Sequence, residues 1–246
     1  MNIILLSIVV IFSYTLIQAI EITSFGSRVA GRISNRNALG TTISQTVYTF
    51  SRFFVVLFLP SLAYVIESGI SINEYLIIVL LAYSFSFITS ALMLLKLNSI
   101  QHFFQIIFLK YNKNSLPMAF FKAFQDKKED LNLSNCNFFS FNKLVTKKTF
   151  VSFLAYIFLI TGFFNAFMLA VLFPENRLTL SQTTTIFHGF GALIFAFYID
   201  PMLSRSIDSF SDDVSWLKNV YSILVGRALS YLVMIIITSF FYFVIY

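Results

Sequence analysis

Charged residues are scarce in this chain. Asp, Glu, Lys and Arg make up only 11% of its 246 residues, against about 25% in ordinary soluble domains. Hydrophobic residues reach 58%, and the mean hydropathy is +0.82. This composition excludes an ordinary soluble domain and is typical of a protein built from membrane-spanning segments.

Residues that carry metal, redox or covalent chemistry are also scarce. Cys136 is the only cysteine, so no intramolecular disulfide can form, and it lies in a polar segment without histidine neighbours. The sequence lacks G-x-x-x-x-G-K-[ST], G-x-S-x-G and H-E-x-x-H motifs and any Cys/His cluster. These absences disfavour ATP-driven transport and metallohydrolysis, so we expect no enzyme activity, no cofactor and no metal site.

The long apolar runs predict one polytopic, all-α transmembrane domain over residues 1–246. Runs of about 20 apolar residues are long enough to cross a bilayer, and spanning segments form helices because their backbone groups find no water there. No Lys or Arg precedes the first run, so we expect a retained span rather than a cleaved signal. Six spans are expected, at residues 3–25, 38–65, 73–95, 149–173, 180–199 and 219–244, the second kinked or ended near Pro60.

Basic residues gather on one side of this predicted topology. Fourteen of the 17 fall in the first, third and fifth loops, whereas the opposite side has Arg177 with Glu67, Glu74 and Glu175. The positive-inside rule makes the basic side cytoplasmic and places both termini outside, facing the periplasm. This topology accounts for the basic charge, so a nucleic-acid partner is not implied.

The longest loop, residues 96–148, holds nine lysines and is expected on the cytoplasmic side. Its segments Ser99–Leu109 and Leu116–Phe124 are rich in aromatic residues and have Lys and polar residues around them. This pattern predicts amphipathic helices that lie on the inner leaflet.

Arg52 lies in the middle of the second predicted span, in the stretch TVYTFSRFFVVLFLP. A charge at the bilayer centre costs about 2.5–3.5 kcal/mol even on lenient scales. Two interpretations remain open. Arg52 either forms a structural ion pair with Glu21 or Asp200, or lines a cavity that receives an anionic substrate.

Further arginines lie near the spans at shallower depths. Arg28 and Arg32 follow Glu21 at helical spacing, and Arg36 continues the stripe if the helix extends that far. These three are either ordinary positive-inside charges of a short loop or a stripe that binds an anion. Arg227 lies about 12 Å into the sixth span at the rise of a helix, where it either snorkels to the interface or points inward. Guanidinium groups bind phosphate oxygens in a bidentate way. The predicted substrate-binding residues are therefore Arg28, Arg32, Arg52 and Arg227.

The fifth predicted span contains a polar, small-residue stretch, formed by Thr183, Thr184, Thr185, His188, Gly189 and Gly191. Small residues permit close helix packing, and His188 is alternatively a proton carrier. Asp200, before Pro201, either caps the following segment or pairs with an arginine. Glu21, His188 and Asp200 are thus the candidates for ion pairing or coupling.

Four short patterns resemble the Amj family of lipid II flippases, the alternate to the MurJ type. Glu21 is followed by Arg28-Val29-Ala30-Gly31, and Ser51-Arg52 resembles a Ser-Arg pair midway through the family's second span. Pro174-Glu175-Asn176-Arg177-Leu178-Thr179 resembles P-E-x-R-x-T, and Asp200-Pro201-Met202-Leu203-Ser204 resembles D-P-x-L-S. The resemblance covers residues 20–55 and 174–230. It departs from the family at Ile22, Val55 and His188, where Thr, Asn and Asn are expected.

The resemblance implies a flippase of the bacterial cytoplasmic membrane that moves a polyprenyl diphosphate lipid with a sugar-peptide head from the inner to the outer leaflet. Two alternatives stay open: a structural scaffold of envelope assembly, and a transporter of another anionic lipid such as undecaprenyl phosphate. The sequence leaves the oligomeric state open, a homodimer included.

Overall fold

The computed structural model describes residues 3–125, 144–209 and 213–245, and Cys136 lies outside them. Every element in these ranges is helical, as the sequence predicts. The elements in chain order are α1 (Ile3–Ile33), α2 (Asn37–Glu67), α3 (Ile72–Leu95), α4 (Leu97–Tyr111), α5 (Leu116–Gln125), α6 (Thr146–Leu172), η2 (Pro174–Asn176), α7 (Arg177–Gln182), α8 (Thr184–Ile194), η3 (Phe195–Ile199), α9 (Asp200–Ser209) and α10 (Asp213–Ile245).

Six helical stretches within the described ranges are long and apolar enough to span a membrane. They correspond in order to the six predicted spans, so the chain is a multi-pass membrane protein. Some predicted ends were wrong. The first helix continues past Phe25 to Ile33, and the second helix does not end at Pro60 but runs on to Glu67.

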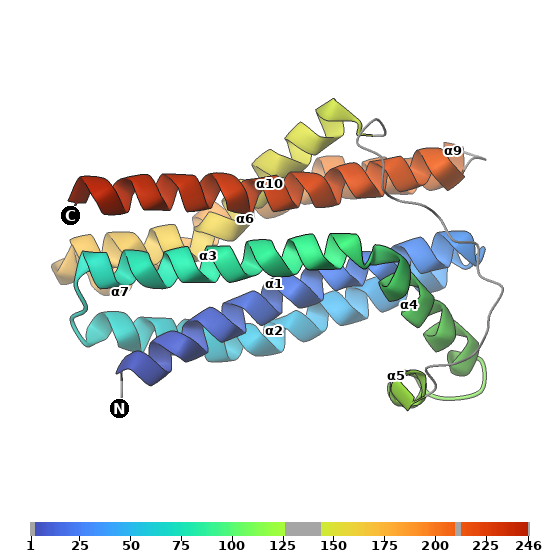
Figure 1. The fold of residues 1–246 in the computed structure, drawn as a ribbon, viewed down its shortest axis with the longest axis horizontal. Coiled ribbons are helices and arrows are strands. Elements are labelled where there is room, and N and C mark those ends of the chain that lie inside the picture. The colour runs from blue at the N-terminus through green and yellow to red at the C-terminus, as the bar shows by residue number, and fades with distance from the viewer. Residues whose placement is uncertain (1–2, 126–143, 210–212, 246) are drawn as a thin grey trace.

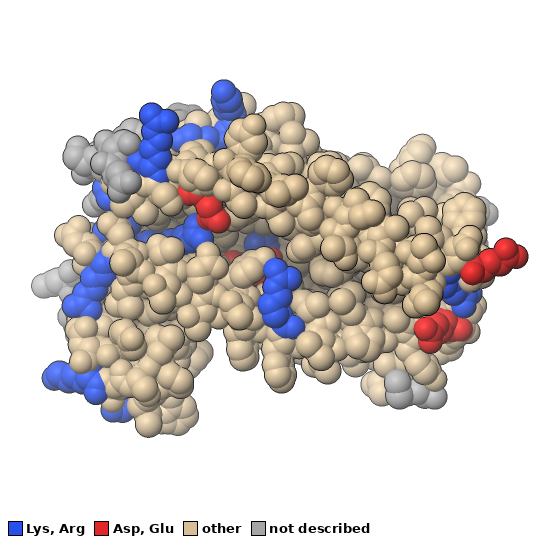
Figure 2. Space-filling model, turned by 180° about the vertical axis from the view of Figure 1, so that it is seen from behind, with Lys and Arg blue, Asp and Glu red and all other residues tan. Residues whose placement is uncertain are grey.

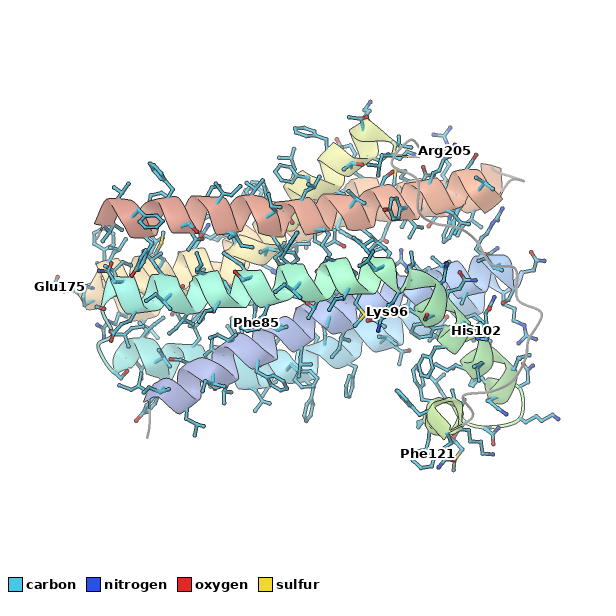
Figure 3. All side chains as sticks on the ribbon, in the orientation of Figure 1. Phe85, Lys96, His102, Phe121, Glu175 and Arg205 are labelled. Carbon is cyan, nitrogen blue, oxygen red and sulfur yellow. The ribbon has the colours of Figure 1, made fainter. Side chains whose placement is uncertain are left out.

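The long helices run roughly parallel, and both visible ends of the chain lie at the same end of the bundle (Figure 1). Basic side chains gather at the opposite end (Figure 2). Figure 3 labels Glu175 at the end that carries the termini, and Lys96 and Arg205 toward the other end. The charge asymmetry read from the loops is therefore present in the fold, and which end faces the cytoplasm stays a prediction.

Helices α1 and α2 cross at a pair of glycines. A Cβ on Gly31 would lie 2.7 Å from the Gly40 Cα, and Ser27 donates a 2.9 Å hydrogen bond to the Gly40 carbonyl. Helices α6 and α10 approach equally closely, because a Cβ on Gly226 would lie 2.5 Å from the Thr149 carbonyl oxygen. Small residues thus bring the backbones together where lipid supplies no hydrophobic driving force.

Two short helices form at the predicted aromatic segments of the long loop. The buried face of α4, with Phe104, Ile107 and Phe108, packs against Ala30 and Ile43 of the bundle. Phe121 of α5 points away from the bundle in Figure 3 and is 61% exposed. That these helices lie on a membrane surface stays a prediction.

The fifth span is an irregular helix. Helix α7 ends at Gln182 and α8 begins at Thr184, with Thr183 between them in helical conformation, and a π-helical turn covers Phe195–Ile199. The π turn directly precedes Asp200-Pro201, and a proline lacks the amide hydrogen that a regular helix needs. Such π turns occur frequently at functional sites.

Candidate functional site

A cavity of about 230 Å³ lies inside the bundle between α1, α2, α6, α10 and the fifth span. Six of the seven predicted site residues line it. They are Glu21, Arg28, Arg52, His188, Asp200 and Arg227. We call it the central cavity.

The central cavity opens to the side of the bundle. Gln45 and Arg52 on α2, and Ala192 and Ala196 on the facing fifth span, all line it and are all exposed. Figure 2 shows this face hollowed, with acidic and basic side chains in and beside the hollow. The central cavity is therefore accessible from the side of the bundle.

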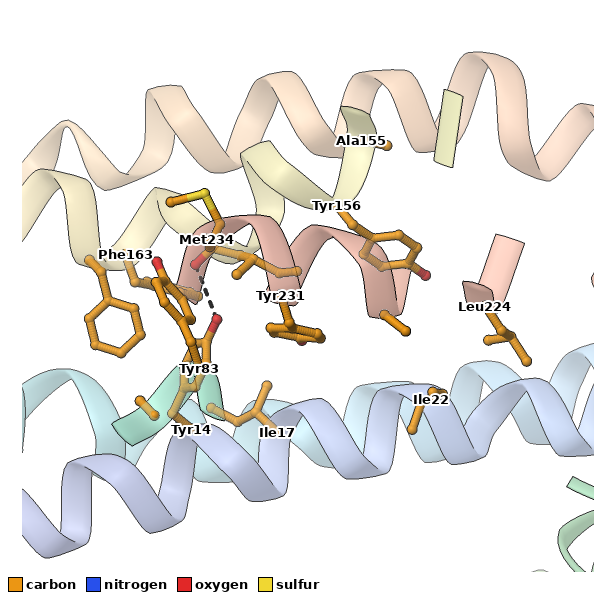
Figure 4. Close-up of a cluster of buried hydrophobic side chains, with 14 of the residues drawn as sticks. Tyr14, Ile17, Ile22, Tyr83, Ala155, Tyr156, Phe163, Leu224, Tyr231 and Met234 are labelled. Atoms are coloured by element: carbon orange, nitrogen blue, oxygen red, sulfur yellow. Dashed lines mark hydrogen bonds between the residues drawn. The ribbon is translucent and has the colours of Figure 1, made fainter. Parts of the chain in front are cut away.

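Arg227 is held in place by groups that surround it. Its side chain is 1% exposed, and Nη2 donates to the Gln18 side-chain oxygen at 2.5 Å and to Glu21 Oε2 at 3.1 Å. Its guanidinium lies 4.8 Å from the centre of the Tyr156 ring, and Tyr231 also donates to the Gln18 oxygen. Figure 4 shows both tyrosines in the space between α1 and the pair of α6 and α10. The snorkelling interpretation was wrong, because the side chain crosses to α1 instead of reaching the interface.

Ser51 and Arg52 face different groups, although they are neighbours in sequence. Ser51 is fully buried, and its hydroxyl donates to the Tyr48 carbonyl at 2.7 Å and lies 3.5 Å from Glu21 Oε1. Arg52 is exposed, and its Nη2 donates to the Tyr48 hydroxyl at 2.8 Å, with the guanidinium 5.1 Å from the Tyr48 ring centre. Among the residues that the structure describes, Arg52 has no carboxylate partner.

Arg28 forms an ion pair with Asp200, the second acid of the cavity. Its Nη1 lies 2.9 Å from Asp200 Oδ1, and its Nε donates to the Ser44 hydroxyl at 3.3 Å. Of the two interpretations of Asp200, the structure thus contains the ion pair. Arg28 and Asp200 also line another cavity, of about 220 Å³, that extends along Thr41 toward the basic end of the bundle. The ion pair therefore lies at the boundary between this cavity and the central cavity.

Arg32 and Arg36 lie outside the central cavity. Arg32 donates to the Ile207 carbonyl at 3.2 Å. Helix α1 ends at Ile33, so Arg36 falls in the turn and donates to Asn112 at 3.0 Å. The role of Arg32 in substrate binding stays a prediction that no contact in the cavity supports.

His188 lies where the central cavity meets a larger one. Its ring packs 5.2 Å from the Phe163 ring, and its Nδ1 is buried without a hydrogen-bond partner in the described part of the chain. The two glycines near His188 have different surroundings. Gly191 packs against α6, with its Cβ position 2.8 Å from the Ala155 carbonyl, while Gly189 has open space around it.

The larger cavity, which we call the distal cavity, has about 720 Å³ and shares Arg52 and His188 with the central one. It runs to Glu67 and Arg177 near the end of the bundle that carries the termini. The three cavities lie next to one another along the bundle, because each neighbouring pair shares lining residues.

Sequence reasoning missed the polar groups that organise the site. Gln18, Tyr48, Tyr156 and Tyr231 hold the arginines or line the cavity. Gln18 was recognisable, because it lies one helical turn before Glu21 on the same face. The tyrosines gave no such signal, because the chain contains 12 of them and no spacing distinguishes these three. The described residues contain no cluster of three or more metal-ligating side chains.

The fixed charges of the central cavity do not cancel. Glu21 and Asp200 are engaged with Arg227 and Arg28, and the remaining charge is Arg52. A partly closed, low-dielectric site with an excess cation attracts anions.

Comparison with known proteins gives one match. Residues 14–243 match the family described as Amj, alternate to MurJ, while no curated protein and no solved structure matches the chain. The match spans nearly the whole helical bundle and includes every residue of the central cavity. This membrane protein, with its laterally open cationic cavity, therefore belongs to the Amj family.

Proposed function

We propose that the protein is a flippase that moves the lipid-linked peptidoglycan precursor, lipid II, from the inner to the outer leaflet of the bacterial cytoplasmic membrane. The family description as an alternate to MurJ supports a flippase role. One observation carries the proposal: Arg52 stands in a laterally open cavity inside the bundle, and both nearby acids pair with other arginines.

The physical task is to carry a diphosphate across about 30 Å of hydrocarbon. An unpaired anion in that medium is prohibitively costly. The Arg52 fork supplies bidentate hydrogen bonds to phosphate oxygens. The polyprenyl tail stays in lipid through the opening between α2 and the fifth span.

Arg28 is the second phosphate ligand in this proposal, and it leaves Asp200 when the substrate arrives. The Arg28 and Asp200 side chains are 13% and 41% exposed, whereas those of Arg227 and Glu21 are 1% and 16% exposed. A hydrated ion pair costs less to open than a buried one. Arg227 therefore links α10 to α1 and keeps a fixed positive charge in the cavity. Arg28 exchanges Asp200 for a phosphate, and Arg32 receives the substrate at the basic end.

The membrane potential can drive this transport without ATP. Each elementary charge that crosses 100 mV gains or loses about 2.3 kcal/mol. If the basic end is cytoplasmic, a negative interior pushes the anionic head group outward and draws the emptied arginine site back. Transport thus needs no covalent step and no cofactor.

The test is growth rescue in bacteria depleted of their other lipid II flippase, combined with an assay of lipid II arrival at the outer leaflet. The wild-type chain should restore both. Arg52→Ala should reduce arrival by tenfold or more at equal protein level, since a charge-assisted hydrogen bond contributes about 1.5–3 kcal/mol. Arg205→Ala is the matched control, because Arg205 is exposed and lines none of the three cavities.

Normal lipid II arrival with Arg52→Ala would refute the cavity role. Rescue by the wild-type chain without lipid II arrival, together with export of undecaprenyl phosphate, would establish the other anionic lipid as substrate. A scaffold would restore growth without moving either lipid. The scaffold interpretation also expects Arg52 to be paired with an acid, and no such pair exists in the described ranges.

A further inference from the structure

We infer that the distal cavity is a separate subsite for the uncharged, hydroxyl- and amide-bearing sugar part of the head group. This inference rests on the proposed function. It places the sugar of lipid II in the distal cavity when the diphosphate is bound at Arg52.

Size separates the two cavities. Pockets that hold ligands of drug size measure about 300–1,000 Å³. The central cavity, at about 230 Å³, lies below that range and suits a diphosphate. The distal cavity, at about 720 Å³, lies within it and has room for a sugar.

One wall of the distal cavity offers neutral hydrogen-bonding groups, while the facing walls on α2 and α6 are mainly apolar, as the two faces of a sugar require. Ser181, Gln182, Thr184 and Thr185 bring hydroxyl and amide groups into the cavity from α7 and the start of α8. The Ser181 and Thr184 hydroxyls donate to backbone carbonyls within their own helices and keep free lone pairs. Gln182 and Thr185 are exposed, and their side chains make no hydrogen bond to any described residue.

The position of Arg52 fixes the direction of the head group. Arg52 and Glu67 both line the distal cavity and lie on one helix, about 22 Å apart at the helical rise. In the substrate, the diphosphate connects the tail to the sugar. With the tail leaving through the lateral opening and the diphosphate at Arg52, the sugar has the distal cavity beside it, past the unpartnered Nδ1 of His188.

The test measures binding of two lipids to the full chain in nanodiscs: lipid II, and undecaprenyl diphosphate without sugar. The double variant Gln182→Met with Thr185→Val keeps side-chain volume and removes the free polar groups. We expect it to weaken lipid II binding about tenfold, the effect of two lost hydrogen bonds, and to change binding of the sugar-free lipid by less than twofold. Arg52→Ala should weaken both.

Thr179→Val is the matched control, because Thr179 is an exposed threonine on α7 outside the distal cavity, and it should change neither affinity. Unchanged thermal melting of all variants shows that they fold. Equal losses for both lipids, or no loss for lipid II, would overturn the subsite while leaving the proposed function intact. A wild-type chain that binds neither lipid would refute the proposed function itself.

Discussion

The ion pair between Arg227 and Glu21 should be the most sensitive polar interaction in the bundle. The two side chains are 3.1 Å apart, which gives a Coulomb attraction of about 5 kcal/mol at an effective dielectric constant of about 20. Desolvation offsets much of that attraction, so the pair contributes little net stability, but removal of one partner leaves an uncompensated charge and costs about 3–5 kcal/mol.

The two single variants should differ in size of effect. Glu21→Gln leaves a fully buried guanidinium without its counter-charge, so we expect a loss of about 3 kcal/mol in the free energy of unfolding. Arg227→Met leaves Glu21, whose side chain is 16% exposed and can be hydrated from the cavity, so we expect a loss of about 2 kcal/mol.

The double variant completes the cycle. With both charges gone, we expect a loss of about 2 kcal/mol, so the two sites couple by about 3 kcal/mol. The measurement is reversible unfolding by SDS titration of the purified protein in detergent micelles. Glu175→Gln serves as control, because this exposed carboxylate has no ion pair within the described residues and should shift stability by less than about 0.5 kcal/mol. Additive single effects would refute the reasoning.

Three further predictions follow from packing and cavity geometry. Gly226→Ala should cost about 1–3 kcal/mol of stability because its Cβ would lie 2.5 Å from a backbone oxygen of α6, whereas Gly189→Ala should leave thermal melting unchanged. Asp200→Asn frees its arginine partner, so affinity for undecaprenyl diphosphate should rise severalfold while the flipping rate falls; unchanged affinity would contradict the exchange of partners. In a Cys136→Ser background, Thr185→Cys should react with a membrane-impermeant thiol reagent added outside intact cells, and protection there would place the distal cavity on the inner side.

The sequence predicted the number, type and order of the spans, because bilayer thickness forces long apolar runs that hydropathy detects directly. It misplaced the end of α1. The apolar window stops near Phe25, yet the helix continues through Arg28, whose charge is compensated by Asp200. A contact between residues 172 positions apart depends on how α1 packs against the fifth span, which local composition does not encode.

The sequence allowed the residues of the candidate site to be predicted, but not which arginine pairs with which acid. Ionisable residues are rare in spans, so Glu21, Asp200 and the arginines were the natural candidates. Their pairing depends on side-chain reach: the long arm of Arg227 extends across to α1, and the hydrogen bond from Tyr231 to Gln18 completes its surroundings. In the polar stretch of the fifth span, His188 and Gly191 both lie against α6 because residues three apart share one face of a helix, whereas Gly189 has open space around it.

In the Ser51-Arg52 pair, one step along a helix separates a buried side chain from one that lines the cavity. Consecutive helical residues point about 100° apart, so Ser51 meets Glu21 inside the bundle while Arg52 faces the cavity. Glu21 is then engaged from two sides, by Ser51 and by Arg227, and is closed to Arg52. With Asp200 held by Arg28, the contacts of the Arg52 guanidinium within the described residues are the Tyr48 hydroxyl and the Tyr48 ring. This arrangement supports the proposal that Arg52 binds the anionic head group, because the cation lines the cavity and has no acidic partner among the described residues.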